Sequence, residues 1–319
     1  MENIEKFITL NYKIEINGCF FIKKGFTCNK WILYGTNGQK YVLKELNYEN
    51  NLSTERLCYI TNFLFDSNLT LEILKTVTDE KYYVYFENKY YILQKYFEHI
   101  SFDAISVEES LLWKIGELLC KCHIQLQKIE LEPFSYYSID FSADQIDKAL
   151  KSEKNKEIYK ILVKKKALIE KMDLKNLQRK YFNINQKFIH GDYYFDNILF
   201  DNSNFKLIDL DRSCLFFQPY EIFKGALFCS YSKKNSDIDN FTNIKSFIGG
   251  YFNTDKSNIN DCIEFIDIYE YILSSDLYGY NSSKSNLVEY FLYRFNILLW
   301  FHENKQKIIN ILKEMRDEY

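Results

Sequence analysis

The chain has 319 residues, of which 47% are hydrophobic, so it can bury a large core and is long enough for two domains or lobes. Its 41 basic and 44 acidic residues nearly balance, and a net charge of −3 excludes the broad positive field that attracts nucleic acid or an anionic membrane. No stretch approaches the roughly 18 uninterrupted apolar residues of a membrane span, and the first residues lack the pattern of a signal peptide, so we expect a cytoplasmic protein.

The first 96 residues carry the pattern of a small antiparallel sheet. Residues 14–45 alternate apolar and polar positions around turn sequences such as Gly35–Gly38, which predicts three strands. Apolar residues at helical spacing predict a helix over 53–66, and residues 72–97 predict two more strands around a turn at Asn88. The sequence therefore predicts a five-stranded lobe with one inserted helix, ending near residue 96.

The remaining residues, 97–319, read as a mainly helical lobe. We expect a long helix around 111–122, a second over 144–171 whose lysine-rich run is a solvated face or a contact for substrate or partner, and short strands between 188 and 212. Helices follow from about residue 220, including one through 286–304 and another at the C-terminus. The expected fold class is α+β, with both lobes in one compact unit.

The eight cysteines include no C-x-x-C motif, and the neighbouring Cys120 and Cys122 have no second pair that would complete a zinc site. We therefore expect reduced, mostly buried thiols.

The segment His190–Asn197, with the sequence HGDYYFDN, carries the most chemical information. It lies between two apolar stretches, and Asp209 follows in a second apolar strand. Phosphoryl transfer needs a carboxylate that orients and deprotonates the attacking hydroxyl, and oxygen ligands that hold Mg²⁺ on the phosphates. Asp192 suits the first task, and Asn197 with Asp209 the second, because a loop between two strands returns both side chains to one end. The alternative is an Asp- and Asn-rich hairpin that only makes turns.

This H-G-D-x-x-x-x-N loop and the motif Leu207-Ile208-Asp209, a hydrophobic residue followed by Ile and Asp, resemble those of the aminoglycoside phosphotransferase and choline kinase family, which are relatives of protein kinases. The resemblance covers most of the chain and implies a two-lobed protein-kinase-like fold. It further implies that Asp192 is the catalytic base, that Asn197 and Asp209 bind Mg²⁺, and that Asp211 supports the metal site. Two departures stand out: the loop has Tyr and Phe where the family often has Pro or Gly, and Glu221 stands where an Asp is usual.

The same resemblance assigns nucleotide-binding residues in the first lobe. Lys44 matches the strand lysine that binds the α- and β-phosphates, with Glu55 as its expected ion-pair partner and Glu45 and Glu49 as competitors. The alternative for Lys44 is an ordinary lysine at a strand edge.

Gly25, in KGFTCN, takes the place of a phosphate loop. LQKYF resembles the hinge between the lobes, so the Lys95 carbonyl and the Phe97 N–H are the expected adenine contacts, to within one residue. Among the histidines, we interpret His123 and His190 as structural braces and assign no role to His99 and His302.

The sequence thus predicts a phosphotransferase that uses ATP, or alternatively GTP, and Mg²⁺ to phosphorylate a hydroxyl of a small molecule. The acceptor is expected to be cationic, an aminoglycoside, choline-like or homoserine-like amine, since acids at 261, 264, 267 and 270 recur every three residues and could face it. A solvated acidic face is the alternative. Expected partners include neither nucleic acid nor membrane, and the chain is expected to be a monomer or homodimer.

Two other functions compete with this one. A protein kinase is disfavoured because H-R-D, D-F-G and A-P-E are missing and only about ten residues separate Asp211 from Glu221. A non-catalytic or structural kinase-like protein, such as a spore-coat-associated relative, is the remaining alternative.

Overall fold

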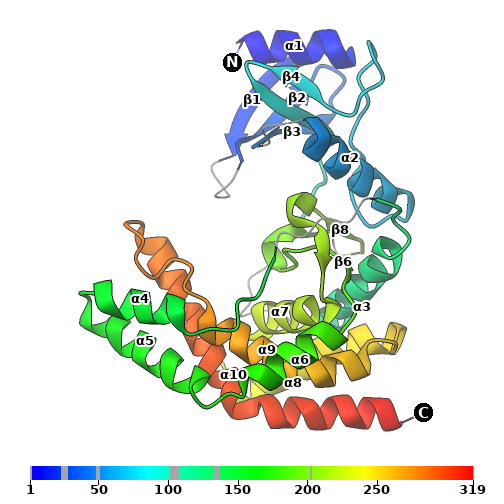
Figure 1. The fold of residues 1–319 in the computed structure, drawn as a ribbon. Coiled ribbons are helices and arrows are strands. Elements are labelled where there is room, and N and C mark those ends of the chain that lie inside the picture. Colours follow the sequence, from blue (N-terminus) through cyan, green and yellow to red (C-terminus); the bar gives the residue numbers. More distant parts are fainter. Residues whose placement is uncertain are drawn as a thin grey trace. The chain divides into compact units, whose positions relative to one another are not determined.

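The structure is a computed structural model that describes residues 2–22, 28–47, 51–100, 108–131, 137–201 and 203–318 (Figure 1). The chain divides into two compact units. The first comprises Met1–Ser101, Gln125–Glu130 and Asp196–Arg212, and the second comprises Phe102–Ile124, Leu131–Phe195 and Ser213–Tyr319. The boundary expected after residue 96 lies near the end of the first of these segments, and the later segment Asp196–Arg212 also packs with the first unit.

A five-stranded antiparallel sheet forms the first unit, as the sequence predicts, with the strand order β1-β2-β3-β5-β4. Its central strand β3 pairs with β2 and β5, so that Lys44 lies opposite Lys30 on one side and Ile92 on the other. Glu87 and Asn88 both have positive φ, which the tight hairpin turn between β4 and β5 requires. The strands are β1 (Ile16–Ile22), β2 (Lys30–Gly35), β3 (Lys40–Leu46), β4 (Val84–Phe86) and β5 (Lys89–Lys95).

Two helices and a small hairpin complete the first unit. Helix α1 (Glu2–Tyr12), which the sequence analysis missed, packs Ile4, Ile8 and Tyr12 into the same core cluster as sheet residues such as Leu43. Helix α2 (Asn51–Asp66) is the helix expected after the third strand. The hairpin of β7 (Ile198–Phe200) and β8 (Phe205–Leu207) is held by the Leu207 N–H, which donates to the Leu69 carbonyl at 2.7 Å.

The second unit is mainly helical, as predicted, with one short two-stranded sheet of β6 (Lys187–Ile189) and β9 (Cys214–Phe216). Helix α9 lies centrally, because it contacts α5, α6, α7 and α10. The helices are α3 (Glu109–Leu126), whose last two residues belong to the first unit, α4 (Asp144–Ser152), α5 (Lys156–Ile169), α6 (Leu174–Asn183), α7 (Gln218–Ser230), α8 (Asp237–Thr254), α9 (Ile259–Ser275) and α10 (Ser285–Asp317).

Helix boundaries differ from the expectation in two places. The stretch 144–171 forms two helices, α4 and α5, because Asn155 caps α5 by accepting hydrogen bonds from the Glu157 and Ile158 N–H groups. The two helices expected at the C-terminus form one helix, α10, of 33 residues.

The lysine-rich run is also not uniformly solvated. Lys165 on α5 is buried, and its ammonium donates to the carbonyls of Leu273 and Asp276 at 2.6 and 2.9 Å, at the C-terminal end of α9. Burial lowers the pKa of Lys165 to about 8. This lysine therefore has a structural role that its position in a charged run did not indicate.

Helices α3 and α8 approach each other so closely that their backbones touch. A Cβ atom at Gly116 would lie 2.0 Å from the Phe247 carbonyl oxygen, and one at Gly250 would lie 1.9 Å from that of Trp113. Only glycine allows this approach.

All eight cysteines are unpaired and six of them are buried, which confirms the expected burial. Within the described ranges no helix is both long and apolar enough to cross a bilayer.

Candidate active site

In the first unit, Lys44 joins two carboxylates that are far away in sequence. Its buried ammonium lies 2.8 Å from Asp209 Oδ1 and 2.7 Å from Asp211 Oδ1. Lys30, opposite Lys44 on the neighbouring strand, lies 2.9 Å from Asp209 Oδ2. The two lysines thus hold both oxygens of Asp209, and a small pocket is lined by Lys44, Asp209 and Asp211 together with residues such as Ile92.

The charges of this cluster keep Lys44 and Asp209 ionised. Burial alone would lower the pKa of Lys44, but Asp211 and Asp209 hold that pKa above its ordinary value. Burial alone would raise the pKa of Asp209, but Lys44 and Lys30 hold it well below the usual range. At neutral pH the cluster therefore offers a cation beside a carboxylate anion.

The β7–β8 hairpin places Asn197 and Asp209 at the same end, as the topological argument predicts. Asn197 directly precedes β7, Asp209 follows β8, and the strands pair with Ile198 opposite Leu207. The Ile208 N–H donates to the Asn197 carbonyl at 3.0 Å, which joins the two segments. Asp209 has a φ of 60°, a left-handed conformation that costs a non-glycine residue about 1 kcal/mol and is frequent at functional sites.

The ligand atoms at the end of the β7–β8 hairpin that carries Asn197 and Asp209 suit Mg²⁺ bound together with a nucleotide. Asn197 and Asp209 supply the oxygen atoms that a hard cation prefers. Among the described residues, no three His, Cys, Asp or Glu side chains gather in a way that would hold a metal ion. Mg²⁺ in phosphoryl-transfer sites is commonly held by one or two carboxylates and by phosphate oxygens, so this small donor set is sufficient.

The structure gives Lys44 different partners from the one expected. Lys44 is paired with Asp209 and Asp211, whereas Glu55 on α2 accepts a hydrogen bond from the Tyr83 hydroxyl at 3.0 Å. Of the competitors, Glu45 accepts from Lys89 and Asn29. Glu49 and the expected phosphate-loop residue Gly25 lie outside the described residues. A role for Glu55 in nucleotide binding stays a prediction.

The expected adenine-binding segment follows the end of β5. Lys95 is the last residue of the strand and pairs with Tyr41. Beyond it, the Tyr96 N–H donates to the Lys40 carbonyl at 2.9 Å, and the Phe97 carbonyl lies 2.9 Å from His99 Nδ1. The backbone beyond β5 is therefore fixed on both sides of Phe97, and the adenine contacts stay predictions.

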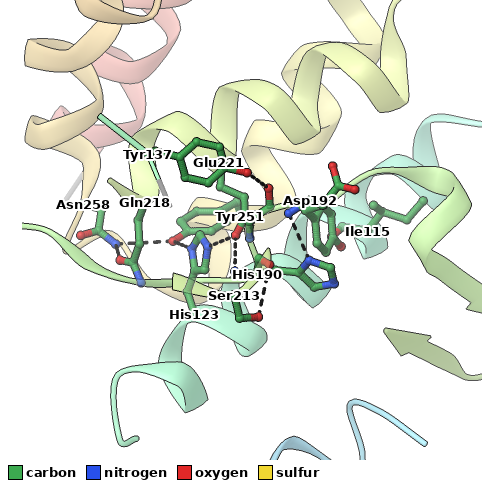
Figure 2. Close-up of polar contacts among 12 residues, drawn as sticks. Ile115, His123, Tyr137, His190, Asp192, Ser213, Gln218, Glu221, Tyr251 and Asn258 are labelled. Carbon is green, nitrogen blue, oxygen red and sulfur yellow. Dashed lines mark hydrogen bonds and ion pairs between the residues drawn. The ribbon is translucent and has the colours of Figure 1, made fainter. Parts of the chain in front are cut away.

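In the second unit, Glu221 anchors the backbone of the H-G-D segment (Figure 2). Its two oxygens accept from the N–H groups of His190 at 2.8 Å and Gly191 at 2.6 Å. Gly191 has a φ of 84°, which favours glycine at this position. The glutamate that departs from the family pattern therefore binds the loop directly, from the first turn of α7.

Glu221 is fully buried and is compensated by charge and hydrogen bonds. Since a carboxylate can only accept, His123 Nε2 donates to Glu221 Oε2 at 3.0 Å, and its Nδ1 lies 2.8 Å from the Tyr251 hydroxyl. Burial alone would raise the pKa of Glu221, but His123, His190 and Lys224 hold it below its ordinary value. His123 thus braces the loop through Glu221, as expected.

The loop is fixed at four further points, which leave Asp192 on a rigid support. His190 Nδ1 accepts from the Asp192 N–H at 3.3 Å, and Ser213 Oγ donates to the His190 carbonyl at 3.2 Å. Tyr137 donates to the Gly191 carbonyl at 2.8 Å, and Tyr193 donates to the Ile115 carbonyl at 2.7 Å. Tyr193 is fully buried, so this departure from the family pattern anchors the loop on α3.

Asp192 itself forms an ion pair that the sequence analysis missed. Lys224 Nζ lies 2.7 Å from Asp192 Oδ1. The sequence feature that could have identified Lys224 is its position three residues after Glu221, which places both on the same face of a helix. Lys30 was missed as well, although the predicted hairpin places it opposite Lys44.

Two of the four acidic residues of α9 that we considered as a ligand-facing row are engaged in ion pairs. Asp267 pairs with Lys180 and Lys305, each at 3.1 Å, and Glu270 pairs with Lys305 and His302. These pairs join α9 to α6 and α10. His302, to which the sequence analysis assigned no role, therefore has an acidic partner.

For Lys44→Ala we expect a rise of about tenfold or more in the KM for ATP, because the site loses a point charge on the phosphates. Steady-state kinetics over a range of ATP concentrations measures this. Lys40→Ala, which removes an exposed lysine of the same strand that pairs with Glu98, is the matched control and should keep the parental KM. Unchanged kinetics of the Lys44 variant at low ATP would contradict the assignment.

Solved structures match this chain over nearly its whole length. An aminoglycoside phosphotransferase from Alicyclobacillus acidocaldarius gives a TM-score of 0.66 at 10% identity, covering 97% of this chain and 95% of that one. A choline kinase from Cryptosporidium parvum gives 0.64 at 15% identity, covering 98% of both chains. A spectinomycin phosphotransferase in complex with ADP and spectinomycin gives 0.57 at 14% identity, covering 99% and 98%.

In sequence comparisons, no protein-family model and no curated protein matches the chain. These three structural matches have identities of 10% to 15%, and they establish the fold. The chain has the protein-kinase-like fold of aminoglycoside phosphotransferases and choline kinases.

Proposed function

We propose that this chain is a small-molecule kinase that transfers the γ-phosphoryl group of ATP to a hydroxyl of an amine-bearing acceptor, with Mg²⁺. The observation that carries the proposal is the contact of Lys44 with Asp209 and Asp211. Asp209 and Asp211 lie 165 and 167 positions after Lys44 in the sequence. A site for nucleotide phosphates requires such a strand lysine beside a carboxylate that can bind the metal.

Each residue has one task in this proposal. Lys44 binds the phosphates of the nucleotide, and Asn197 with Asp209 would hold Mg²⁺, which neutralises charge on the phosphate oxygens when it is bound. Asp192 orients the acceptor hydroxyl and takes its proton as the new O–P bond forms and ADP leaves. Glu221 and His123 keep the H-G-D backbone in place for that step.

Support for the nucleotide comes from the structural relatives. The spectinomycin phosphotransferase was solved with ADP, and an aminoglycoside 2'-phosphotransferase with GDP. We propose ATP as the donor of this chain, with GTP as the alternative, and a cytoplasmic location where both are abundant. A monomer or a homodimer is proposed for its state of assembly.

An amine on the acceptor is supported by the names of several relatives. They include a choline kinase, an ethanolamine kinase and an aminopropanol kinase, with TM-scores of 0.64, 0.53 and 0.64. In this chain Asp267 and Glu270 form ion pairs with lysines and His302. They therefore do not support the proposal that the acceptor carries an amine.

An acceptor panel tests the proposal. The parent protein is incubated with Mg²⁺ and ATP and with aminoglycosides, choline, ethanolamine, homoserine or neutral sugars, while ADP release is followed. We expect at least one amine-bearing acceptor to raise ADP release about tenfold or more above the rate without acceptor. Strong turnover of neutral sugars with none of the amines would contradict the proposed acceptor class.

The non-catalytic alternative makes a different prediction for the same protein. A kinase-like scaffold would either fail to bind nucleotide or would bind it without turning over any member of the panel. Melting temperatures with ATP, with and without Mg²⁺, separate these outcomes, because a ligand that binds only the folded state raises the Tm.

A further inference from the structure

The ion pair between Lys224 and Asp192 is the feature of the second unit that the proposed roles leave unexplained. The Lys224 side chain is 13% exposed and that of Asp192 is 31% exposed, with 2.7 Å between Nζ and Oδ1. Lys224 lies one turn after Glu221 on α7, and Glu221 holds the N–H groups of His190 and Gly191. One helix therefore contacts both the backbone of the loop and the carboxylate that the loop carries.

The surroundings of the pair are aromatic. The Lys224 ammonium lies 6.0 Å from the centre of the Tyr194 ring, and the rings of Tyr137 and Tyr220 lie nearby, tilted at 45° to each other with their centres 5.8 Å apart. Tyr290 of α10 also interacts electrostatically with Lys224 and Asp192. Large aromatic side chains restrict the space open to a lysine side chain, so the ammonium has a defined position.

The charges around the pair keep Lys224 a cation. Burial alone would lower its pKa, but Tyr220, Asp192 and Tyr137 hold that pKa above its ordinary value. The buried Glu221, one turn earlier on α7, also interacts electrostatically with Lys224, and Arg294 and Asp276 form an ion pair of their own. Lys224 therefore interacts with two carboxylates, and its ion pair is with Asp192.

Stability alone gives a weak reason for a lysine at this position. Burying an ammonium has a desolvation cost that a single ion pair only partly offsets, and an apolar side chain of similar size is often as good or better. A function for the charge accounts for it more directly. Catalytic groups need their side chains held in one orientation by a neighbour whose own position is fixed.

We infer that Lys224 is a positioning residue for phosphoryl transfer, whose ammonium holds the Asp192 carboxylate in the orientation that receives the proton of the acceptor hydroxyl. The inference rests on the proposed function, in which Asp192 is the base. Helix α7 then sets the loop backbone through Glu221 and the direction of the base through Lys224. The O–H bond of the acceptor breaks toward Asp192 as its oxygen bonds to the γ-phosphorus, and Lys224 loses no proton.

Lys224→Met and Lys224→Arg test the inference. The assay is hydrolysis of ATP with Mg²⁺ and without added acceptor, in which water takes the place of the hydroxyl. For Lys224→Met we expect kcat to fall by about 10- to 100-fold while the KM for ATP stays within about twofold, because only the chemical step needs an oriented base. Lys224→Arg keeps the positive charge and should retain most of kcat.

Lys180→Met is the matched control, because it removes a partly exposed lysine–aspartate pair in the same unit, that of Lys180 with Asp267. It should leave both kcat and KM at the parental values. Melting temperatures are measured for every variant, so that loss of the fold is separated from loss of orientation.

If Lys224→Met does not fold, Lys224→Ala is assayed with added ethylammonium, which should raise its kcat, whereas the same concentration of sodium ion should not. The inference is overturned if a folded Lys224→Met keeps kcat within about twofold of the parent, or if neither arginine nor ethylammonium restores activity. If the parent turns over ATP and Lys224→Met does so at the same rate, this inference is overturned while the proposed function stands. A folded parent that shows no Mg²⁺-dependent ATP turnover with any acceptor of the panel overturns the proposed function, and this inference with it.

Discussion

Replacing Asp192 by Asn should lower turnover by about 10² or more while the fold and ATP binding are kept, because the acceptor hydroxyl loses its proton acceptor. The loop has supports other than the Asp192 carboxylate, because Glu221, Ser213 and Tyr137 bind the backbone of residues 190 and 191. An Asn side chain can still accept a hydrogen bond from Lys224, so the loop should keep its shape.

The measurement for Asp192→Asn is kcat with the best acceptor of the panel, beside the affinity for ATP from calorimetry. Asp196→Asn, a change of an exposed aspartate in the same loop, is the matched control and should keep most of kcat. Activity of Asp192→Asn within about twofold of the parent would remove Asp192 from the catalytic role.

For Asp209→Ala we expect the largest loss, a fall in Mg²⁺-dependent ATP turnover by about 10³ or more, because a hard cation depends on anionic oxygen ligands. Asp211→Ala should lose less, since Asp209 remains to bind the metal and to pair with Lys44. Asp209→Asn separates charge from shape, because Asn tolerates the left-handed backbone with a φ of 60° that Ala does not favour.

Turnover of the three variants is measured over a range of Mg²⁺ concentrations at fixed ATP. Asp209→Asn should be nearly as inactive as Asp209→Ala, because both lack the anion. Equal losses for Asp209→Ala and Asp211→Ala would mean that the wrong carboxylate was chosen or that both are ligands.

The sheet and the H-G-D loop could be predicted because their signals are local. Strand alternation and turn residues such as Asn88 act within a few positions, and the hairpin that joins Asn197 to Asp209 follows from two short apolar strands with a polar turn. The capping residue Asn155, which divides the lysine-rich stretch into α4 and α5, is a local signal as well, and it was overlooked.

Partners between distant segments were harder to predict. Lys44 was expected to pair with a glutamate near it in sequence, but it pairs with Asp209 and Asp211. Periodicity predicts the face of a helix or strand on which a residue lies. It does not predict which oppositely charged residue from a distant segment packs against that face. The acids of α9 show the same limit, since the lysines that engage Asp267 come from α6 and α10.

The structure explains two residues that depart from the family pattern. Glu221 and Tyr193 looked like substitutions of a motif, whereas both anchor the loop that carries Asp192. No local pattern indicated that a carboxylate ten residues beyond Asp211 would bind the backbone of His190.

The central claim, transfer of a phosphoryl group to a hydroxyl, is tested most directly by ³¹P nuclear magnetic resonance of the parent protein with Mg²⁺, ATP and the acceptor panel. The account predicts a new phosphomonoester resonance that grows as the γ-phosphate of ATP declines, that requires Mg²⁺, and that is lost with Asp192→Asn. A folded, nucleotide-binding parent that yields only unchanged ATP, or only inorganic phosphate, with every acceptor would contradict it.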